Sequence, residues 1–334
     1  MKKETTAPLL EVKNLKMYFQ TKHKGQNGNV VVKAVDDVSF SVYPGETFGL
    51  VGESGCGKTT TGKAILRVLD PTDGQVIYKG RDIAKLSRRE LKSFRRELQL
   101  IFQDPYSSLD PRQSVYSILK EAVCADHKHR TEAEIRERCD ELMTLVDLDP
   151  VMMGDRYPHE MSGGQRQRLG IARALACNPE LIVCDEEPVS ALDVSIQAQI
   201  INLFADLQEK LGLTYILVAH DWAVVRHIAD RIGVMYLGHL IEVMDSAELF
   251  HNSLHPYTRA LLSAVPTTDY YGEKGRNRVV LEGEVPSPLH APTGCPFHPR
   301  CRCCTEECKQ KMPPLQDVGD GHFVACFNYK NVDY

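Results

Sequence analysis

The sequence predicts an α/β protein with a largely parallel sheet, followed by a small cysteine-rich C-terminal domain. Three observations predict this fold. Apolar strands alternate with helical patterns along most of the 334 residues, and one strand runs into a glycine-rich loop and a helix. Six of the 11 cysteines lie in the last 40 residues. At about 150 residues per domain, the length allows one large domain and one smaller domain.

The first half of the large domain begins with two strands, which a polar stretch containing Gly25 and Gly28 joins as a hairpin loop. A Pro44-Gly45 turn then leads into a short apolar strand and a helix. The expected elements here are strands at 9–19, 34–42 and 47–51 and a helix at 60–69.

The second half alternates more regularly, and Thr131 with Glu134 has the spacing of a capping box at the start of a helix. The expected elements are strands at 98–102, 181–184 and 214–219, helical patterning over 112–153, and helices at 165–176, 196–211 and 256–265. Near residue 252 the chain becomes rich in Pro, Cys and short turns. We therefore expect two domains, residues 8–252 and 253–334.

Composition and charge exclude several classes of protein. The chain has 40 Lys and Arg, 45 Asp and Glu, and a net charge of −5, which argues against a strongly basic nucleic-acid binder. No apolar run approaches the roughly 20 residues that a membrane span needs. The N-terminal Met1-Lys-Lys-Glu segment is not followed by the apolar region of a secretory signal. We expect a cytoplasmic protein, in which clustered cysteines bind a metal more often than they form disulfides.

The segment Gly52-Glu-Ser-Gly-Cys-Gly-Lys-Thr59 has the pattern of a P-loop between a strand and a helix. Its glycines let successive backbone N–H groups point at phosphate oxygens, at a helix N-terminus that carries partial positive charge. Lys58 is expected to reach the β- and γ-phosphates, and the Thr59 hydroxyl to bind Mg²⁺. The expected ATP-contacting residues of this segment are Gly52, Glu53, Ser54, Gly55, Cys56, Gly57, Lys58, Thr59 and Thr60.

A second acidic site follows the apolar strand Ile182-Val-Cys-Asp185. A carboxylate at the end of such a strand fits the Walker B role, in which Asp185 holds the Mg²⁺. Glu186 follows directly and is placed to polarise the attacking water. Together with the P-loop, these residues predict a nucleoside triphosphatase.

The segment Met161-Ser-Gly-Gly-Gln165 resembles the signature motif of the ATP-binding cassette (ABC) family. The resemblance implies a RecA-like P-loop ATPase core with an antiparallel β subdomain and an α-helical subdomain at about 106–160. It also implies two such domains arranged head to tail, with ATP between them. The signature of one domain then contacts the γ-phosphate held by the P-loop of the other, through Ser162 and Gly164. Gly163 and Gln165 are further expected ATP-binding residues of this segment.

Further family landmarks occur in the family's order. Gln103 resembles the Q-loop glutamine, which also binds Mg²⁺; Asp193, in Ser-Ala-Leu-Asp, resembles the D-loop aspartate; and His220 resembles the switch histidine. Phe19 or Tyr18 matches the aromatic residue that stacks on adenine. Only one can face the base because side chains alternate along a strand, and Phe19 is the preferred residue.

The chain departs from the family after Asp185. The family pattern is Asp-Glu-Pro-x-Ser-Ala-Leu-Asp, whereas this chain has an additional glutamate, Glu187, before Pro188. Glu186 is the expected base because it directly follows Asp185, and Glu187 is the alternative. The insertion suggests a site that hydrolyses ATP poorly or relies on its partner's site.

The C-terminal segment narrows the family. Leu254-His-Pro-Tyr-Thr-Arg, Gly294-Cys-Pro-Phe-His-Pro-Arg-Cys301 and Val324-Ala-Cys-Phe327 resemble the tail of oligopeptide and dipeptide importer ATPases, and the second, F-type ATPase subunit in particular. The implied partners are a paralogous ATPase, two membrane permeases and an extracellular peptide-binding protein, with the chain peripheral on the cytoplasmic face of the membrane. Nickel importers share much of this tail. A catalytically weak regulatory subunit and a non-transport ABC ATPase are two further hypotheses that the sequence leaves open.

Four cysteines, Cys295, Cys301, Cys308 and Cys326, occupy the positions of four cysteines in those importer tails. Four thiolates suit tetrahedral Zn²⁺ or a [4Fe–4S] cluster. Their wide spacings favour the cluster, with zinc or plain thiols as alternatives. The remaining tail cysteines, Cys303 and Cys304, do not fit the pattern.

Overall fold

The computed structural model describes residues 7–22, 29–102, 104, 108–125, 130–185, 194–265 and 279–331. Two compact units emerge from the chain. The first contains Tyr43–Glu46 and Lys85–Val218, and the second contains Pro8–Val42, Thr47–Ala84 and Ala219–Tyr334. Each unit therefore combines segments that lie far apart in the sequence. The boundary expected between residues 252 and 253 concerns consecutive domains and stays a prediction.

The first unit is built on parallel strands in the order β8-β7-β6. Every residue of β7 and β8 is buried, as expected for parallel strands covered on both faces. The strands are β6 (Leu98–Ile101), β7 (Leu181–Cys184) and β8 (Thr214–Ala219). The helices are α2 (Arg88–Glu97), α4 (Val115–Cys124), α5 (Glu132–Leu145), α6 (Pro150–Met153), α7 (Gly163–Leu175) and α8 (Val194–Leu211).

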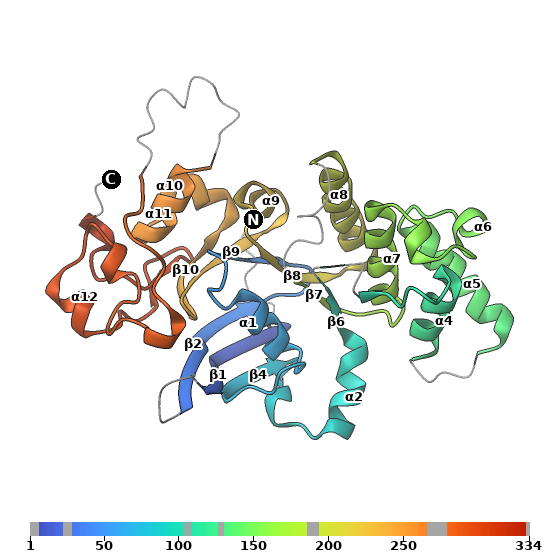
Figure 1. The fold of residues 1–334 in the computed structure, drawn as a ribbon, viewed down its shortest axis with the longest axis horizontal. Coiled ribbons are helices and arrows are strands. Elements are labelled where there is room, and N and C mark those ends of the chain that lie inside the picture. The colour runs from blue at the N-terminus through green and yellow to red at the C-terminus, as the bar shows by residue number, and fades with distance from the viewer. Residues whose placement is uncertain are drawn as a thin grey trace. The chain divides into compact units, whose positions relative to one another are not determined.

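Helices α4, α5, α6 and α7 gather as one cluster, green in Figure 1, and α5 contacts both α4 and α7. The expected capping box at the start of α5 is confirmed: Thr131 accepts from the Glu134 N–H, and Glu134 accepts from the Thr131 N–H. The apolar face of α5 is buried through Cys139, Leu142 and Met143.

The second unit contains an antiparallel sheet in the order β2-β1-β4-β5, drawn in blue to cyan in Figure 1. It matches the antiparallel β subdomain that the resemblance implied. Its strands are β1 (Leu10–Lys22), β2 (Asn29–Val42), β4 (Asp73–Tyr78) and β5 (Arg81–Asp82).

The same unit holds strands in the order β11-β12-β10-β9-β3. Only β3 and β9 are parallel here, so the sheet is mixed and the expected parallel character is confined to part of it. These strands are β3 (Thr47–Val51), β9 (Arg231–Tyr236), β10 (His239–Asp245), β11 (Gln316–Asp317) and β12 (Phe323–Val324). The helices are α1 (Lys58–Ile65), α9 (Trp222–Ile228), α10 (Leu249–Asn252), α11 (Pro256–Ser263) and α12 (Glu306–Gln310).

Two differences from the sequence-based expectation have local causes. Helix α1 ends at Ile65 rather than at residue 69, because Arg67 adopts a left-handed conformation (φ 53°) and its guanidinium donates to the Ile83 carbonyl. The hairpin of β9 and β10 turns at Leu237 and Gly238, both with positive φ, without the Asn-Gly signal that marks most such turns.

Within the described ranges, the structure contains no helix that is both long enough and apolar enough to cross a bilayer.

Candidate functional site

The P-loop follows β3, which is buried throughout. Its glycines adopt backbone conformations that other residues rarely reach, with φ of 149° at Gly52, 78° at Gly55 and 106° at Gly57. A Cβ atom at Gly52 would lie 2.3 Å from the Met235 carbonyl oxygen, and one at Gly57 would lie 2.3 Å from the Ala34 carbonyl oxygen. The loop therefore requires glycine at both ends.

Lys58 folds over this loop. Its ammonium group donates to the carbonyl oxygens of Gly52 at 2.8 Å and Glu53 at 3.1 Å, and the residue is 3% exposed. Gly57 is the N-cap of α1 and has no side chain that could cap the helix. A nucleotide with Mg²⁺ needs hydrogen-bond donors for its phosphates and oxygen ligands for the metal. The backbone N–H groups at this helix end and the Lys58 ammonium group are such donors, and the Thr59 hydroxyl is such a ligand.

Cys56 has a packing role in this loop. Its thiol is buried, 3.8 Å from the Lys58 ammonium group, and burial raises its pKa above the usual value. The thiol is therefore neutral at pH 7, and its sulfur packs against Gly52 and accepts from the Lys58 ammonium group.

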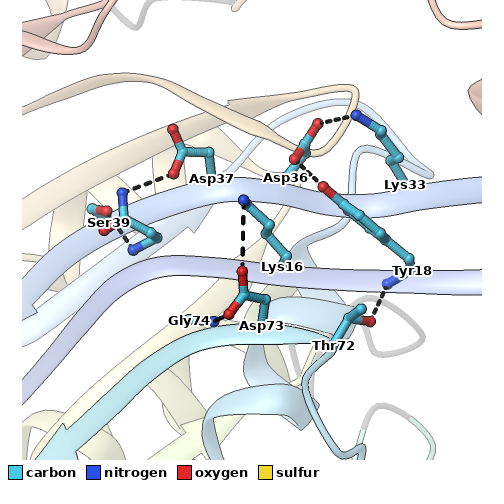
Figure 2. Close-up of polar contacts among 10 residues, drawn as sticks. Lys16, Tyr18, Lys33, Asp36, Asp37, Ser39, Thr72, Asp73 and Gly74 are labelled. Carbon is cyan, nitrogen blue, oxygen red and sulfur yellow. Dashed lines mark hydrogen bonds and ion pairs between the residues drawn. The ribbon is translucent and has the colours of Figure 1, made fainter.

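On β1, Tyr18 is held by a polar network on β2 (Figure 2). Its hydroxyl donates to Asp36 at 2.5 Å, and Lys33 donates to the same carboxylate at 2.9 Å. The Lys33 ammonium also lies 5.4 Å from the centre of the Tyr18 ring. Burial and the Asp36 carboxylate both raise the pKa of Tyr18. Because side chains alternate along a strand, Phe19 is expected on the opposite face from this network.

In the first unit, Asp185 directly follows β7 and is 4% exposed. Its backbone N–H donates to the Ile101 carbonyl, so the parallel pairing of β7 and β6 fixes its position. Other predicted residues of this region lie outside the described residues, namely Gln103, Glu186, Glu187 and Asp193.

The signature segment forms the N-terminus of α7. Ser162 is the N-cap: its hydroxyl accepts from the Gln165 N–H at 3.3 Å, and its own N–H donates to the Gln165 side chain at 2.9 Å. A Cβ atom at Gly164 would lie 2.8 Å from the Ile196 side chain, so the absence of a side chain at Gly164 lets α7 approach α8 closely. This second glycine-rich helix end is therefore capped by its own side chains.

His220 directly follows β8 and is exposed. The next residue, Asp221, caps α9 by accepting from the N–H groups of Ala223 and Val224. The histidine thus follows the end of β8, the strand position that the sequence predicted, and its role in the site stays a prediction.

The four predicted ligand cysteines converge in the second unit. All four line one cavity of about 10 Å³, together with Cys303, Phe297 and His255. Burial raises the pKa of Cys295 and of Cys301 to about 12. The four thiols form no disulfide.

This arrangement does not confirm the predicted metal site. The cavity has the room of about one water molecule, and no group of three or more His, Cys, Asp or Glu residues in the described part of the chain is placed to hold a metal ion. The donor chemistry fits a tetrathiolate site, but the placement of the thiols does not.

Sequence reasoning missed one feature of the P-loop. Glu53 is held by Arg300 and Tyr257, which lie more than 200 residues later in the chain. No local pattern marks such a contact, because it depends on the tail packing against the P-loop.

Comparison with known proteins agrees with this geometry. The ABC transporter family model matches residues 35–189. The chain is 53% identical over 323 residues to the oligopeptide transport ATP-binding protein AppF of Bacillus subtilis, which covers 96% of this chain and 97% of that protein. The chain belongs to the ABC transporter ATP-binding family. Members of this family hydrolyse ATP, and the chain is therefore an ATPase.

Further matches support the same assignment. The model of the oligopeptide/dipeptide transporter C-terminal region matches residues 241–308. The putative oligopeptide transport ATP-binding protein YkfD of Bacillus subtilis is 51% identical over 98% of this chain and 97% of its own length. A solved dimer of the ATP-binding cassette MJ0796, bound to ADP and Pi, has a TM-score of 0.63 and 28% identity, over 71% of this chain and 98% of that one.

Proposed function

We propose that this chain is the ATP-hydrolysing motor subunit of a di- or oligopeptide ABC importer. One observation carries the proposal: the chain joins a P-loop of the required geometry to a tail matching the oligopeptide/dipeptide transporter C-terminal region. Relatives named for oligopeptide transport match it over nearly its whole length. The peptide cargo comes from those names, and nickel is the alternative cargo.

We assign the catalytic roles by family position. Lys58 and the P-loop N–H groups bind the phosphates, while Thr59, Gln103 and Asp185 hold Mg²⁺. Glu186 polarises the attacking water and His220 contacts the γ-phosphate. The buried position of Asp185 at the end of β7 supports its role.

Phe19 is the proposed adenine-stacking residue. The Tyr18 hydroxyl is committed to Asp36, and Lys33 lies over its ring, so Phe19 is the neighbouring aromatic side chain outside that network. We therefore expect Phe19→Ala to weaken MgATP binding about tenfold, the loss of one base–aromatic stack. Tyr18→Phe is a control for the polar network alone: it removes the hydroxyl that donates to Asp36, keeps the ring, and should leave MgATP affinity within about twofold of wild type.

The proposed assembly is a head-to-tail heterodimer with a paralogous ATPase, bound to two membrane permeases and served by an extracellular peptide-binding protein. In this assembly, Ser162, Gly163, Gly164, Gln165 and Asp193 face the ATP held by the partner's P-loop. The chain would lie on the cytoplasmic face of the membrane, held there by the permeases. Residues 8–252 form the nucleotide-binding domain, with its helical subdomain at about 106–160, and residues 253–334 form the importer-type tail.

The test is reconstitution of this chain with its permeases in proteoliposomes. Peptide uptake that requires ATP, and that stops when Lys58→Ala is placed in this chain alone, supports the proposal. Uptake that continues with this variant supports the catalytically weak regulatory subunit instead. Nickel uptake without peptide uptake would reassign the cargo, and failure to bind any permease would favour a non-transport ATPase.

The additional glutamate is tested separately. Glu186→Gln should abolish ATP hydrolysis while MgATP still binds, because a neutral amide cannot act as the base. Glu187→Gln is the matched control and should retain hydrolysis. The reverse result would assign the base to Glu187, and an undiminished rate in both variants would contradict either assignment.

We also propose that Cys295, Cys301, Cys308 and Cys326 hold a [4Fe–4S] cluster, with Zn²⁺ as the alternative. Their convergence on one cavity supports this, although the thiols must deprotonate and move to bind either group. Anaerobically purified protein with an absorbance band at about 400 nm and bound iron would support the cluster. Colourless protein with stoichiometric zinc would support the alternative, and protein lacking both metals would contradict the site.

A further inference from the structure

The tail of the chain holds the second residue of the P-loop by an ion pair. Arg300 donates to both carboxylate oxygens of Glu53, at 2.8 Å to Oε2 and 3.3 Å to Oε1. Such a two-point contact between guanidinium and carboxylate fixes the direction of both groups. The side chain of Arg300 is 7% exposed and that of Glu53 is 26% exposed, so solvent screens the pair less than a surface pair.

A second contact holds the backbone of the same residue. The Glu53 N–H donates to the Tyr257 hydroxyl at 2.9 Å. Tyr257 belongs to a buried aromatic cluster, in which its ring lies 4.7 Å from that of Tyr236 and 5.3 Å from that of Phe297. Two of these aromatic residues, Tyr257 and Phe297, come from the tail segment that also supplies Arg300. The hydroxyl of Tyr257 therefore has a rigid support.

These contacts act where phosphate binds. Lys58 donates to the carbonyl oxygens of Gly52 and Glu53, so the residue that Arg300 and Tyr257 hold is also a residue that positions the phosphate-binding lysine. A carboxylate at this point of the loop opposes the approach of a polyphosphate unless a cation neutralises it. Arg300 supplies that cation.

We propose that Arg300, supported by Tyr257, is a positioning residue for ATP binding, through which the C-terminal region sets the affinity of the P-loop. It acts in two ways. It neutralises Glu53 next to the phosphates, and it fixes the first turn of the loop so that less conformational freedom is lost when ATP binds. This role concerns ATP binding and does not depend on the transported cargo.

The experiment measures MgATP affinity of the full-length chain by isothermal titration calorimetry, with the thermal midpoint recorded for every variant. Arg300→Ala should weaken MgATP affinity about tenfold, because it leaves an uncompensated carboxylate beside the phosphates. Arg302→Ala is the matched control. Arg302 lies two residues away and pairs with Glu282 on the surface, so its loss should change affinity less than about twofold.

The double variant separates positioning from simple structural support. Combining Arg300→Ala with Glu53→Gln should return MgATP affinity to within about threefold of wild type, because no unpaired carboxylate remains. A purely structural pair would leave the double variant as weak as Arg300→Ala or weaker. That result overturns the proposal, as does an Arg300→Ala affinity within twofold of wild type.

Two conservative variants keep the proposal testable if Arg300→Ala does not fold. Arg300→Lys retains the positive charge and should keep MgATP affinity within about threefold of wild type. Tyr257→Phe removes only the hydroxyl that accepts from the Glu53 N–H, and should weaken MgATP about threefold without lowering the charge. Unchanged affinity in Tyr257→Phe, together with a loss of more than tenfold in Arg300→Lys, would overturn the proposed division of roles.

Discussion

The two glycine-rich helix N-termini of this chain, the P-loop before α1 and the signature before α7, are capped in opposite ways. At the P-loop, the N-cap is Gly57, which has no side chain with which to cap α1. At the signature, Ser162 and Gln165 cap α7 reciprocally. An uncapped helix end offers its N–H groups to a ligand, whereas a self-capped end has already satisfied some of them.

The backbone conformations at these two helix ends also differ. Three P-loop glycines adopt φ between 78° and 149°, while Gly164 lies within the regular helix α7. The glycine conformations therefore fix the P-loop backbone, and Arg300 and Tyr257 hold its second residue, Glu53. The signature is a helix end capped by its own side chains, at which the Ser162 oxygen accepts from the Gln165 N–H and the hydroxyl keeps its own proton to donate. This contrast fits the proposed roles, in which the P-loop binds ATP in the single chain and the signature meets ATP only in the dimer.

The largest expected effect comes from the glycine conformations. Gly57→Ala would place a Cβ atom 2.3 Å from the Ala34 carbonyl at φ 106°, so the loop cannot keep its shape. We expect a loss of about a hundredfold in MgATP affinity, measured by calorimetry on the full-length chain. Gly164→Ala is the matched control: its Cβ meets only the Ile196 side chain, and MgATP affinity should stay within about twofold. Equal losses in both variants would break the contrast.

The sequence predicts the local patterns of this chain better than its long-range contacts. The P-loop and the Thr131 capping box are local patterns, and the structure confirms both. The contact of Glu53 with Arg300 joins residues 247 positions apart, so no local pattern reveals it. Apolar periodicity continues past Ile65 and predicts a helix to residue 69, whereas the left-handed conformation of Arg67 ends α1 at Ile65.

The four cysteines show the opposite limit. Their convergence was expected from the sequence, and they do line one cavity. Donor distances depend on the side-chain conformations of each thiol, which spacing in the sequence does not determine. The sequence therefore predicted which residues meet, but not whether they meet at distances suited to a metal.

The second prediction concerns the stability of the fold at low pH. His255 is buried beside Glu242, which accepts from the His255 N–H and from the His322 side chain. Burial lowers the pKa of His255 to about 4, against the opposing charge of Glu242. The unfolded chain, with a histidine pKa of about 6.5, takes up the proton first. The neutral histidine therefore stabilises the fold fully above pH 6.5, and this contribution is lost as the pH falls from 6.5 towards 4, with a loss of about 2 kcal/mol at pH 5.

We expect this loss of stability at low pH to appear first in α1 and the P-loop. His255 accepts from the Tyr257 N–H, and Tyr257 holds Glu53, so protonation should loosen α1 and its loop. The protection factors of the α1 amides, corrected for the slower intrinsic exchange at low pH, should fall between pH 7 and pH 5 relative to those of α7. His255→Asn keeps an acceptor for the Tyr257 N–H without a titratable ring, and should remove most of this pH dependence. An identical pH dependence in the variant would show that other groups cause it.

The smallest effect tests the self-capped helix end. Ser162→Ala removes the acceptor for the Gln165 N–H and should lower the free energy of unfolding by about 1 kcal/mol, with faster amide exchange in the first turn of α7. MgATP affinity of the isolated chain should not change, because the signature faces the partner's ATP in the proposed dimer. ATP hydrolysis by the assembled pair should nevertheless fall. If Ser162→Ala weakened MgATP binding by the isolated chain as strongly as Gly57→Ala does, the signature would belong to the same permanent site as the P-loop. A loss of hydrolysis seen only on assembly would instead support a contact between Ser162 and the partner's ATP, as the proposed dimer requires.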